Sequence, residues 1–473
     1  MIQPLRLTLP QARARGATRV LLAAGLMLVA AACSDSSEPV APAGRLSLGK
    51  APAGPSVSSA SPAYGHRDTT VTVRVLGSGF SAGAVAEWAL AGVPDAAKIR
   101  TNSTEYVSPS ELIANITISA DADLRLWDIT VTLVGGKKGV GTEKFEVTTA
   151  TVLGAGTIGG DMRVEAMNDQ GSVAGYAGAA DAFVYDNLSA SLVALGGGQA
   201  WGIDALGTTA LGRDAGFNPV AWVRGLAGGW TVQPLPSGGI QGIATRTATA
   251  TDGSLIASGW LSVPQARRQT ANQPVLWRRV GGVWQAPEYY VVPGSAAAGY
   301  DIASGGQMAG RTTLADGSVR GVVWHTSSTY TVLDGIAYAI NDAGTIVVGE
   351  LNGAPAYWYR NSATGAWTTG GTRLPSLAGS SCVGGRARDL NDSGIVVGWS
   401  CAANGKRQAT VWSLDLSGPS PVVVESPIGL GGLGVIGSGA ETSGAQSVTS
   451  APPYTAVGGA ASPTTLLVSW SIP

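Results

Sequence analysis

The feature that most constrains the fold is a motif, Asn-Asp-x-Gly, that recurs with similar flanks in the second part of the chain. Its clearest copies are Glu165-Ala-Met-Asn168-Asp-Gln-Gly171, Tyr338-Ala-Ile-Asn341-Asp-Ala-Gly344 and Arg388-Asp-Leu-Asn391-Asp-Ser-Gly394. Asn and Asp tolerate left-handed backbone and Gly supplies a positive φ, so the motif predicts a tight turn between two antiparallel strands. The predicted structural turn residues are Asn168, Gly171, Asn341, Gly344, Asn391 and Gly394. Calcium binding is a poorer interpretation, because one Asp per turn does not supply converging carboxylates.

Each copy is followed by a Val/Ile-rich segment ending in Gly and by a third segment ending in an aromatic residue. Including degenerate copies, the aromatic marks are Tyr185, Trp222, Trp277, Trp324, Trp358, Trp412 and Trp470. Four short antiparallel strands per unit are typical of a propeller blade, which buries its faces only by stacking on neighbours. The last mark lies so near the end of the sequence that its unit has no room for a fourth strand. Residues 147–153 can supply that strand, and this predicts a closed ring without free edges. We therefore expect a seven-bladed β-propeller over 147–473, or six or eight blades if a degenerate copy is misread.

This region resembles the HAF family of bacterial extracellular repeats. The residues that carry the resemblance are Leu153-Gly-Ala-Gly-Thr-Ile-Gly-Gly160, the turn units above and Asp181-Ala182-Phe183. The resemblance implies export and a repeat architecture, and it implies no defined activity. The Gly-rich segment also fits G-x-G-x-x-G, but a dinucleotide site needs a helix to follow, and a repeat unit follows here.

The preceding segment, 55–146, alternates strand and turn signals and has no helical period. Its markers are Gly77-Ser-Gly79-Phe80, Ser110-Glu111-Leu112, Asp128-Ile-Thr-Val131 and Phe145-Glu-Val147. These residues resemble the IPT/TIG family of immunoglobulin-like domains. The resemblance implies a β-sandwich that acts as a spacer or interaction module, so the whole chain is expected to be all-β.

The N-terminus has the pattern of an export signal. Four arginines precede an apolar run, Val20 to Ala32, which is too short to span a bilayer but suits a signal peptide. The run ends Leu28-Val29-Ala30-Ala31-Ala32-Cys33 and resembles a bacterial lipoprotein signal, although Ala30 stands where the family prefers Leu. We expect a signal at 1–33, lipidation of Cys33 and a flexible, Ser/Ala/Pro/Gly-rich tether at 34–54. The expected location is the outer membrane or cell surface, attached only through the lipid. Cleavage without lipidation would make the protein periplasmic or secreted.

Composition excludes several functions. The chain has 30 Lys+Arg against 31 Asp+Glu, so no basic excess favours nucleic acid, and its two histidines argue against a His-rich metal site. No cofactor or metal is predicted. In an exported protein the two remaining cysteines, Cys382 and Cys401, are expected to form a disulfide, two separate buried thiols being the alternative.

No catalytic constellation is apparent, and no catalytic residues are predicted. The chain is expected to be a monomeric, non-catalytic envelope protein that binds an unknown protein or glycan through the propeller and the immunoglobulin-like module. The alternatives are an extracellular polysaccharide hydrolase or lyase with a site in the propeller funnel, where single acids such as Glu165, Asp301 and Asp389 lie near first strands, and a structural envelope component. The best candidates for ligand contact are aromatics outside the repeat register: Trp201, Trp230, Trp260, Trp284 and Trp399.

Overall fold

The computed structural model describes residues 54–153, 161–178, 181–265, 269–377, 384–402, 405–433, 443–461 and 465–472. In these ranges every regular element is a β-strand, so the expected all-β class is confirmed. No helix in the described part of the chain is long and apolar enough to cross a membrane. The predicted signal, the lipidation site Cys33 and the tether up to residue 53 lie outside the described residues.

Strands β1 to β9 form two sheets. The first has the order β1-β3-β7-β6, and the second has the order β2-β9-β8-β4-β5. Their bounds are β1 Ser56–Ser61, β2 Tyr64–His66, β3 Thr69–Ser78, β4 Val85–Leu90, β5 Val93–Pro94, β6 Ile99–Ser108, β7 Glu111–Ile118, β8 Leu126–Thr132 and β9 Lys138–Thr148.

One hydrophobic core joins these two sheets. Alternate residues of β7, from Leu112 to Ile118, are fully buried, as period-2 alternation requires of a half-buried strand. They belong to the same core cluster as Trp88 and Phe145 of the second sheet, whose rings meet edge to face at 5.6 Å. The described core of this region draws only on residues between Val57 and Val147.

The remaining strands form seven successive antiparallel sheets in the described ranges, which we number 1 to 7; sheets 1 and 2 share one long strand, and sheets 3 and 6 each have a fifth strand. Sheet 1 contains β11 (Met162–Met167), β12 (Val173–Ala177), β13 (Asp181–Asp186) and the first half of β14 (Ser191–Ile203). Sheet 2 contains the second half of β14, β15 (Thr209–Asp214), β16 (Pro219–Arg224) and β17 (Trp230–Pro234). Sheet 3 contains β18 (Gly242–Thr249), β19 (Leu255–Pro264), β20 (Thr270–Val280) and β21 (Val283–Trp284), with β22 (Glu288–Tyr289) also paired to β20. Sheet 4 contains β23 (Ala296–Ile302), β24 (Met308–Thr313), β25 (Val319–Trp324) and β26 (Tyr330–Leu333).

Sheets 5 to 7 follow the same order. Sheet 5 contains β27 (Ile336–Ile340), β28 (Ile346–Leu351), β29 (Ala354–Tyr359) and β30 (Thr372–Arg373). Sheet 6 contains β31 (Gly385–Leu390), β32 (Ile395–Cys401), β33 (Arg407–Asp415) and β34 (Val422–Val423), and β35 (Ile428–Gly429) also pairs with β33. Sheet 7 contains β36 (Ser443–Val448), β37 (Thr455–Ala461), β38 (Thr465–Ser471) and, from far earlier in the chain, β10 (Ala150–Val152).

The strand that precedes the repeats pairs with the last one. Ala150 lies opposite Trp470 and Val152 opposite Val468 in antiparallel register, so β10 serves as the fourth strand of sheet 7. This is the pairing that the truncated last unit predicts.

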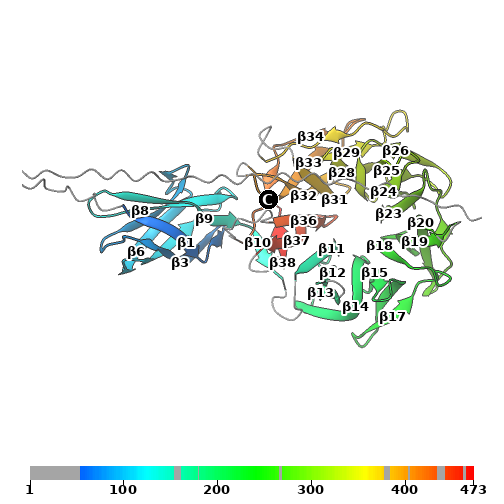
Figure 1. The fold of residues 1–473 in the computed structure, drawn as a ribbon, viewed down its shortest axis with the longest axis horizontal. Coiled ribbons are helices and arrows are strands. Elements are labelled where there is room, and N and C mark those ends of the chain that lie inside the picture. The colour runs from blue at the N-terminus through cyan, green and yellow to red at the C-terminus, as the bar shows by residue number, and fades with distance from the viewer. Residues whose placement is uncertain are drawn as a thin grey trace, which may run out of the picture. The chain divides into compact units, whose positions relative to one another are not determined.

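The first strands of the seven sheets contact one another in sequence, β11, β14, β18, β23, β27, β31 and β36, and β36 contacts β11 in turn. Figure 1 shows these strands gathered around a common centre, with the later strands of each sheet farther out. The aromatic marks of the third strands lie between the sheets. Trp222, Trp277, Trp324, Trp358, Trp412 and Trp470 are almost completely buried in the apolar clusters there.

Candidate functional site

A β-bulge interrupts the first strand of every sheet at the same point of the repeat. The register shifts between Val164 and Ala166 in β11, for example, and between Ala337 and Ala339 in β27. A bulge leaves one residue unpaired and re-aims its side chain. The bulged residues are Glu165, Trp201, Arg246, Tyr300, Tyr338, Arg388 and Gln446, with Thr245 sharing the longer bulge of sheet 3.

The bulge explains the Gly that ends the Val/Ile-rich segment of each repeat. A Cβ on Gly398 would lie 2.0 Å from the carbonyl oxygen of Arg386, and a Cβ on Gly349 would lie 1.9 Å from that of Ile336. The same close approach to a first-strand carbonyl, between 1.9 and 2.2 Å, recurs at Gly175, Gly212, Gly259, Gly310 and Gly458. Since real Cβ atoms do not come so close, only Gly fits opposite the bulge.

The residue after this Gly varies among the units. In order, these residues are Tyr176, Arg213, Trp260, Arg311, Glu350, Trp399 and Gly459. Together with most of the bulged residues they line the end of the first strands at which those strands begin, whereas Arg246 lines a pocket at the opposite ends of these strands. We use the name funnel for the end at which these strands begin. Its described side chains are mainly aromatic or Arg, the types that dominate energetically important binding contacts.

A continuous aromatic arc crosses sheets 1 to 5 of the funnel. It consists of Tyr176, Trp201, Trp260, Tyr300 and Tyr338, whose successive ring centroids are 6.0 to 6.4 Å apart. Two edge-to-face contacts lie between two stacked contacts, and aromatic pairs favour both geometries. The indole Nε1 of Trp201 is buried without a hydrogen-bond partner in the described part of the structure.

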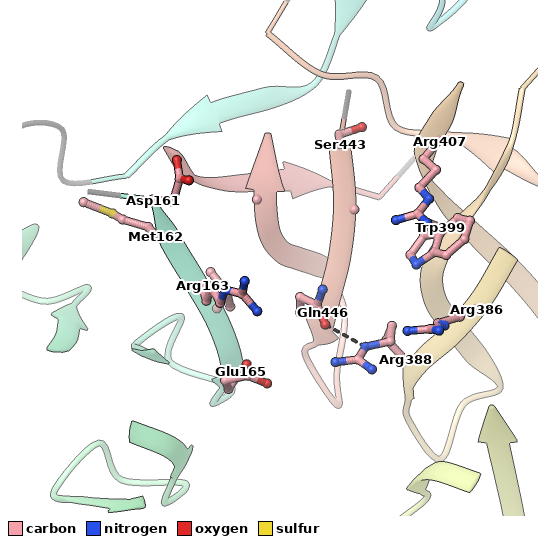
Figure 2. Close-up of a pocket in the computed structure, with 13 residues that line it drawn as sticks. Asp161, Met162, Arg163, Glu165, Arg386, Arg388, Trp399, Arg407, Ser443 and Gln446 are labelled. Atoms are coloured by element: carbon pink, nitrogen blue, oxygen red, sulfur yellow. Dashed lines mark hydrogen bonds between the residues drawn. The ribbon is translucent and has the colours of Figure 1, made fainter. Parts of the chain in front are cut away.

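An arginine pocket of about 510 Å³ occupies the rest of the funnel, where sheets 6, 7 and 1 meet. Its cations are Arg163, Arg386, Arg388 and Arg407, and its carboxylates are Asp161 and Glu165. Figure 2 shows Arg163 and Glu165 on β11, Gln446 on β36, and the other arginines with Trp399 on the strands of sheet 6. Their side chains project into one space from three sheets.

Contacts within the funnel orient these guanidinium groups. Arg388 donates from Nε to Oε1 of Gln446 at 2.7 Å and lies 4.9 Å from the ring centroid of Tyr338. Arg386 donates from Nε to Glu350 at 2.5 Å, and Arg407 lies 4.2 Å above the ring of Trp399. A guanidinium held through Nε, as in Arg386 and Arg388, keeps its terminal N–H groups directed elsewhere, and planar bidentate recognition of carboxylate uses such N–H groups.

Glu165 is the bulged residue of sheet 1 and lies between the cations. Burial raises the pKa of its carboxyl group, while Arg388, Arg246 and Arg163 act to lower it. The ionisation of the Glu165 carboxyl group therefore depends on its burial and on the nearby arginines.

A second pocket, of about 470 Å³, lies at the opposite ends of the first strands, where those strands terminate. Its acidic residues are Asp169, Asp301, Asp342, Asp389 and Asp392. We call them the carboxylate clasps, because each accepts hydrogen bonds from a neighbouring sheet.

Two clasps join neighbouring first strands directly. Asp301 accepts from the amides of Ile302 and Ile340, each at 2.9 Å. Asp389 accepts from the amide of Val448 at 3.0 Å and from the hydroxyl of Ser447 at 2.6 Å. Burial raises the pKa of Asp301 to about 7 and raises that of Asp389, while Arg246 lowers both.

The other clasps come from the Asn-Asp-x-Gly turns. Asp342 accepts a hydrogen bond from the amide of Ser304 in the preceding sheet. Asp392 accepts hydrogen bonds from the side chain of Asn341 and from the amide of Ala343. Asp169 accepts a hydrogen bond from the amide of Ser450 of sheet 7. The described residues include no group of three or more His, Cys, Asp or Glu arranged to hold a metal ion.

The predicted turn residues lie in these turns. Gly171, Gly344 and Gly394 have φ of 78°, 67° and 83°. The side-chain oxygens of Asn168, Asn341 and Asn391 accept amide hydrogens of their own turns. Each of these Asn also donates from Nδ2 to the following sheet, a link that the turn interpretation does not include.

The five predicted ligand-contacting tryptophans divide into two groups. Trp201, Trp260 and Trp399 lie in the funnel. Trp284 is buried in the core between sheets 2 and 3, and Trp230 packs against the core between sheets 1 and 2. Of the predicted disulfide pair, Cys401 is disulfide-bonded, and Cys382 lies outside the described residues.

Sequence reasoning missed the tyrosines and arginines of the funnel. A signal was present for some of them, because Tyr176 follows a repeat Gly, and Tyr300 and Tyr338 stand three residues before a turn Asn or its equivalent. The residue type at these positions varies among units of an otherwise regular repeat, whereas Arg163, Arg386 and Arg407 occupy neither position.

No family model matches this sequence, and a comparison with the curated proteins finds no match. The resemblances to the IPT/TIG and HAF families therefore stay predictions.

Proposed function

We propose that this chain is an exported, non-catalytic binding protein whose repeat region is a closed seven-bladed β-propeller, and that the funnel binds a glycan. The observation that carries the proposal is the funnel itself, in which aromatic and Arg side chains from neighbouring sheets converge. The 55–146 region, as an immunoglobulin-like module, would serve as a spacer or second contact.

The propeller assignment is supported by the four-stranded sheets, the cycle of contacts among their first strands and the β10–β38 pairing. Asp169 of sheet 1 also bonds to Ser450 of sheet 7, so a clasp joins the first and last units. Replacing Ala150, Thr151 and Val152 with three glycines should accelerate amide hydrogen exchange in β38 and leave β28 unchanged. Unaltered exchange in β38 would argue against closure.

A glycan is favoured as partner because the aromatic arc offers ring faces beside polar groups. The negative face of an aromatic ring suits the weakly positive C–H surface of a pyranose, and adjacent polar groups accept or donate hydrogen bonds to hydroxyls. Arg311 lies 5.7 Å from the ring of Tyr300, and the hydroxyl of Tyr338 is 3.4 Å from Glu350. Polar groups thus lie beside two rings of the arc.

The test is a glycan-binding screen with the full chain, read by intrinsic tryptophan fluorescence. We expect affinity in the micromolar range and a loss of at least about tenfold for Trp260→Ala, since one stacked aromatic contributes on the order of 1–3 kcal/mol. Tyr330→Ala is the control, because Tyr330 is exposed on β26 outside the funnel. Equal binding by the two variants, or binding only to proteins, would contradict the proposal.

One observation favours a second candidate, a lyase that removes a proton from an acidic sugar. Glu165 has a raised pKa and lies among arginines that could neutralise a sugar carboxylate, which suits a general base. Release of unsaturated products from a polyuronate, abolished by Glu165→Gln, would favour the lyase over simple binding.

The proposed location is the cell envelope, through a lipid on Cys33. Cys33→Ser should move the protein from the membrane fraction to the soluble fraction. Unchanged partitioning would mean that Cys33 carries no anchor.

A further inference from the structure

We propose that the arginine pocket and the aromatic arc form one site for an acidic saccharide, with an anionic group of one sugar in the pocket and neighbouring rings on the arc. This inference rests on the proposed glycan-binding function and specifies its ligand class.

The first argument is charge. The whole chain has a net charge of −1, yet the pocket gathers four arginines against two carboxylates. Such a local excess of cations around a concave site favours an anionic ligand.

The second argument is hydrogen-bonding capacity. In the described structure Arg388 donates only from Nε, to Gln446, and its plane is set against Tyr338. Arg386 is similarly held through Nε by Glu350 and lies 5.8 Å from the same Tyr338 ring. The two guanidinium groups therefore have terminal N–H groups available for a planar anion, the arrangement that carboxylate and sulfate oxygens match.

The third argument is continuity. Tyr338 is both the last ring of the arc and the ring beneath Arg386 and Arg388. At the other end of the arc, Tyr176 interacts with Arg163 of the pocket. A chain molecule that leaves the pocket in either direction therefore meets an aromatic face next.

A single-stranded nucleic acid also combines rings with negative charge, but it carries a charge on every nucleotide and needs cations along its whole path. Here most of the cations lie at one side of the funnel, and Glu165 and Glu350 interrupt them. A saccharide with occasional acidic groups fits this distribution better.

The experiment compares four ligands by calorimetry with the full chain: a short oligogalacturonate, its carboxyl-reduced counterpart, a sulfated oligosaccharide and an oligothymidylate. We expect an acidic sugar to bind at least about tenfold more tightly than the reduced one, as a charge-assisted hydrogen-bond pair implies. Whether the uronate or the sulfate ester binds more tightly identifies the anion. Affinity should fall as salt rises, because the preference is electrostatic.

Arg388→Ala should remove the preference for the acidic sugar and change affinity for the reduced one by less than about twofold. Arg373→Ala, at an exposed residue of β30, is the matched control and should change neither. The salt dependence of the unaltered protein gives a readout that does not depend on whether the variant folds.

Equal affinity for the acidic and reduced sugars, with both lost in Trp260→Ala, would overturn this inference and leave the proposed function standing. Failure of every sugar to bind would overturn both. Tighter binding of the oligothymidylate than of any sugar would overturn the inference in favour of nucleic acid.

Discussion

The two ends of the first strands differ in how their polar side chains are satisfied. At the funnel, residue types vary among the units, and Arg386 and Arg388, held through Nε, line a pocket. At the clasps, the same residue type recurs, and backbone amides of the next sheet occupy the carboxylates. We infer that one end of the repeat holds its units together and that the other end serves the binding proposed above.

The bulge separates these two roles. Before the bulge, polar side chains of the first strands line the arginine pocket, and Arg386 there also bonds to Glu350 of the preceding sheet. After it, the chain enters the Asn-Asp turn, whose side chains bond to both neighbours. Substitutions should thus affect binding at one end and stability at the other, with the Gly opposite the bulge affecting both.

The largest effect is expected for Gly398→Ala. The added Cβ would lie 2.0 Å from the carbonyl oxygen of Arg386, so the bulge that orients Arg388 must shift. We expect the free energy of unfolding to fall by more than about 3 kcal/mol, the upper range for overpacking. Urea denaturation measures this loss, and Gly370→Ala is the control because nothing lies within 4 Å of its added Cβ. Equal stability of the two variants would remove our explanation of the repeated Gly.

The next largest effect is expected on stability when a clasp carboxylate is removed. Asp389→Ala leaves the amide of Val448 and the hydroxyl of Ser447 without their acceptor in a buried place, at a cost of about 2–3 kcal/mol. Affinity for sugar should stay within about twofold in the folded variant. Asp316→Ala, which removes a similar bond from an exposed turn, should cost less than about 1 kcal/mol. If Asp389→Ala instead abolished sugar binding and left stability unchanged, the division of roles would be wrong.

The pH dependence of stability tests the Asp301 clasp in a second way. The pKa of Asp301 in the folded protein is about 7, above the usual value, so the folded state binds this proton more readily than the unfolded state. The stabilisation that protonated Asp301 provides is complete when the pH lies below the pKa of this carboxyl group in the unfolded protein. It is lost as the pH rises through the folded-state pKa of about 7. The Asp301 contribution should fall by about 1–2 kcal/mol between pH 5 and pH 8. It is measured as the difference between the original protein and Asp301→Ala, and a difference independent of pH would contradict the expectation.

The smallest effect is expected for pH on the affinity of the funnel for an acidic sugar. Because the pKa of Glu165 is raised, a fall in pH neutralises this carboxylate beside Arg163, Arg246 and Arg388. The affinity for an acidic sugar should therefore rise by about threefold from pH 8 to pH 5, where the sugar carboxyl remains ionised. Glu165→Gln should bind as tightly at both pH values as the original protein does at pH 5. A pH dependence that persists in this variant would have another origin.

Much of the fold could be predicted because its signals are local. The Asn-Asp-x-Gly turns, the third-strand aromatics and the missing fourth strand of the last unit each follow from a few neighbouring residues. The pairing of a strand within 147–153 with the last unit was predicted from this shortage, and the structure sets its register, with Ala150 opposite Trp470. The second role of Asn168, its bond to the next sheet, could not be predicted, since it depends on how adjacent units stack.

The candidate site was predicted only in part. Aromatics outside the repeat register gave three funnel residues, Trp201, Trp260 and Trp399, but also Trp230 and Trp284, which pack in apolar cores. Arg163, Arg386 and Arg388 were missed because an isolated Arg has no local pattern. Their convergence depends on the placement of three sheets side by side.

By itself the sequence determined the all-β class, the repeating unit, its turns and the strand that pairs with the last unit, because period-2 hydrophobicity and turn chemistry act over a few residues. Only the tertiary structure decided which side chains share a space. The bulge turns one variable residue per unit toward the centre, and the stacking of sheets then places residues from distant units within contact distance. Charge and aromaticity that are scattered along the chain are concentrated in this way into one site.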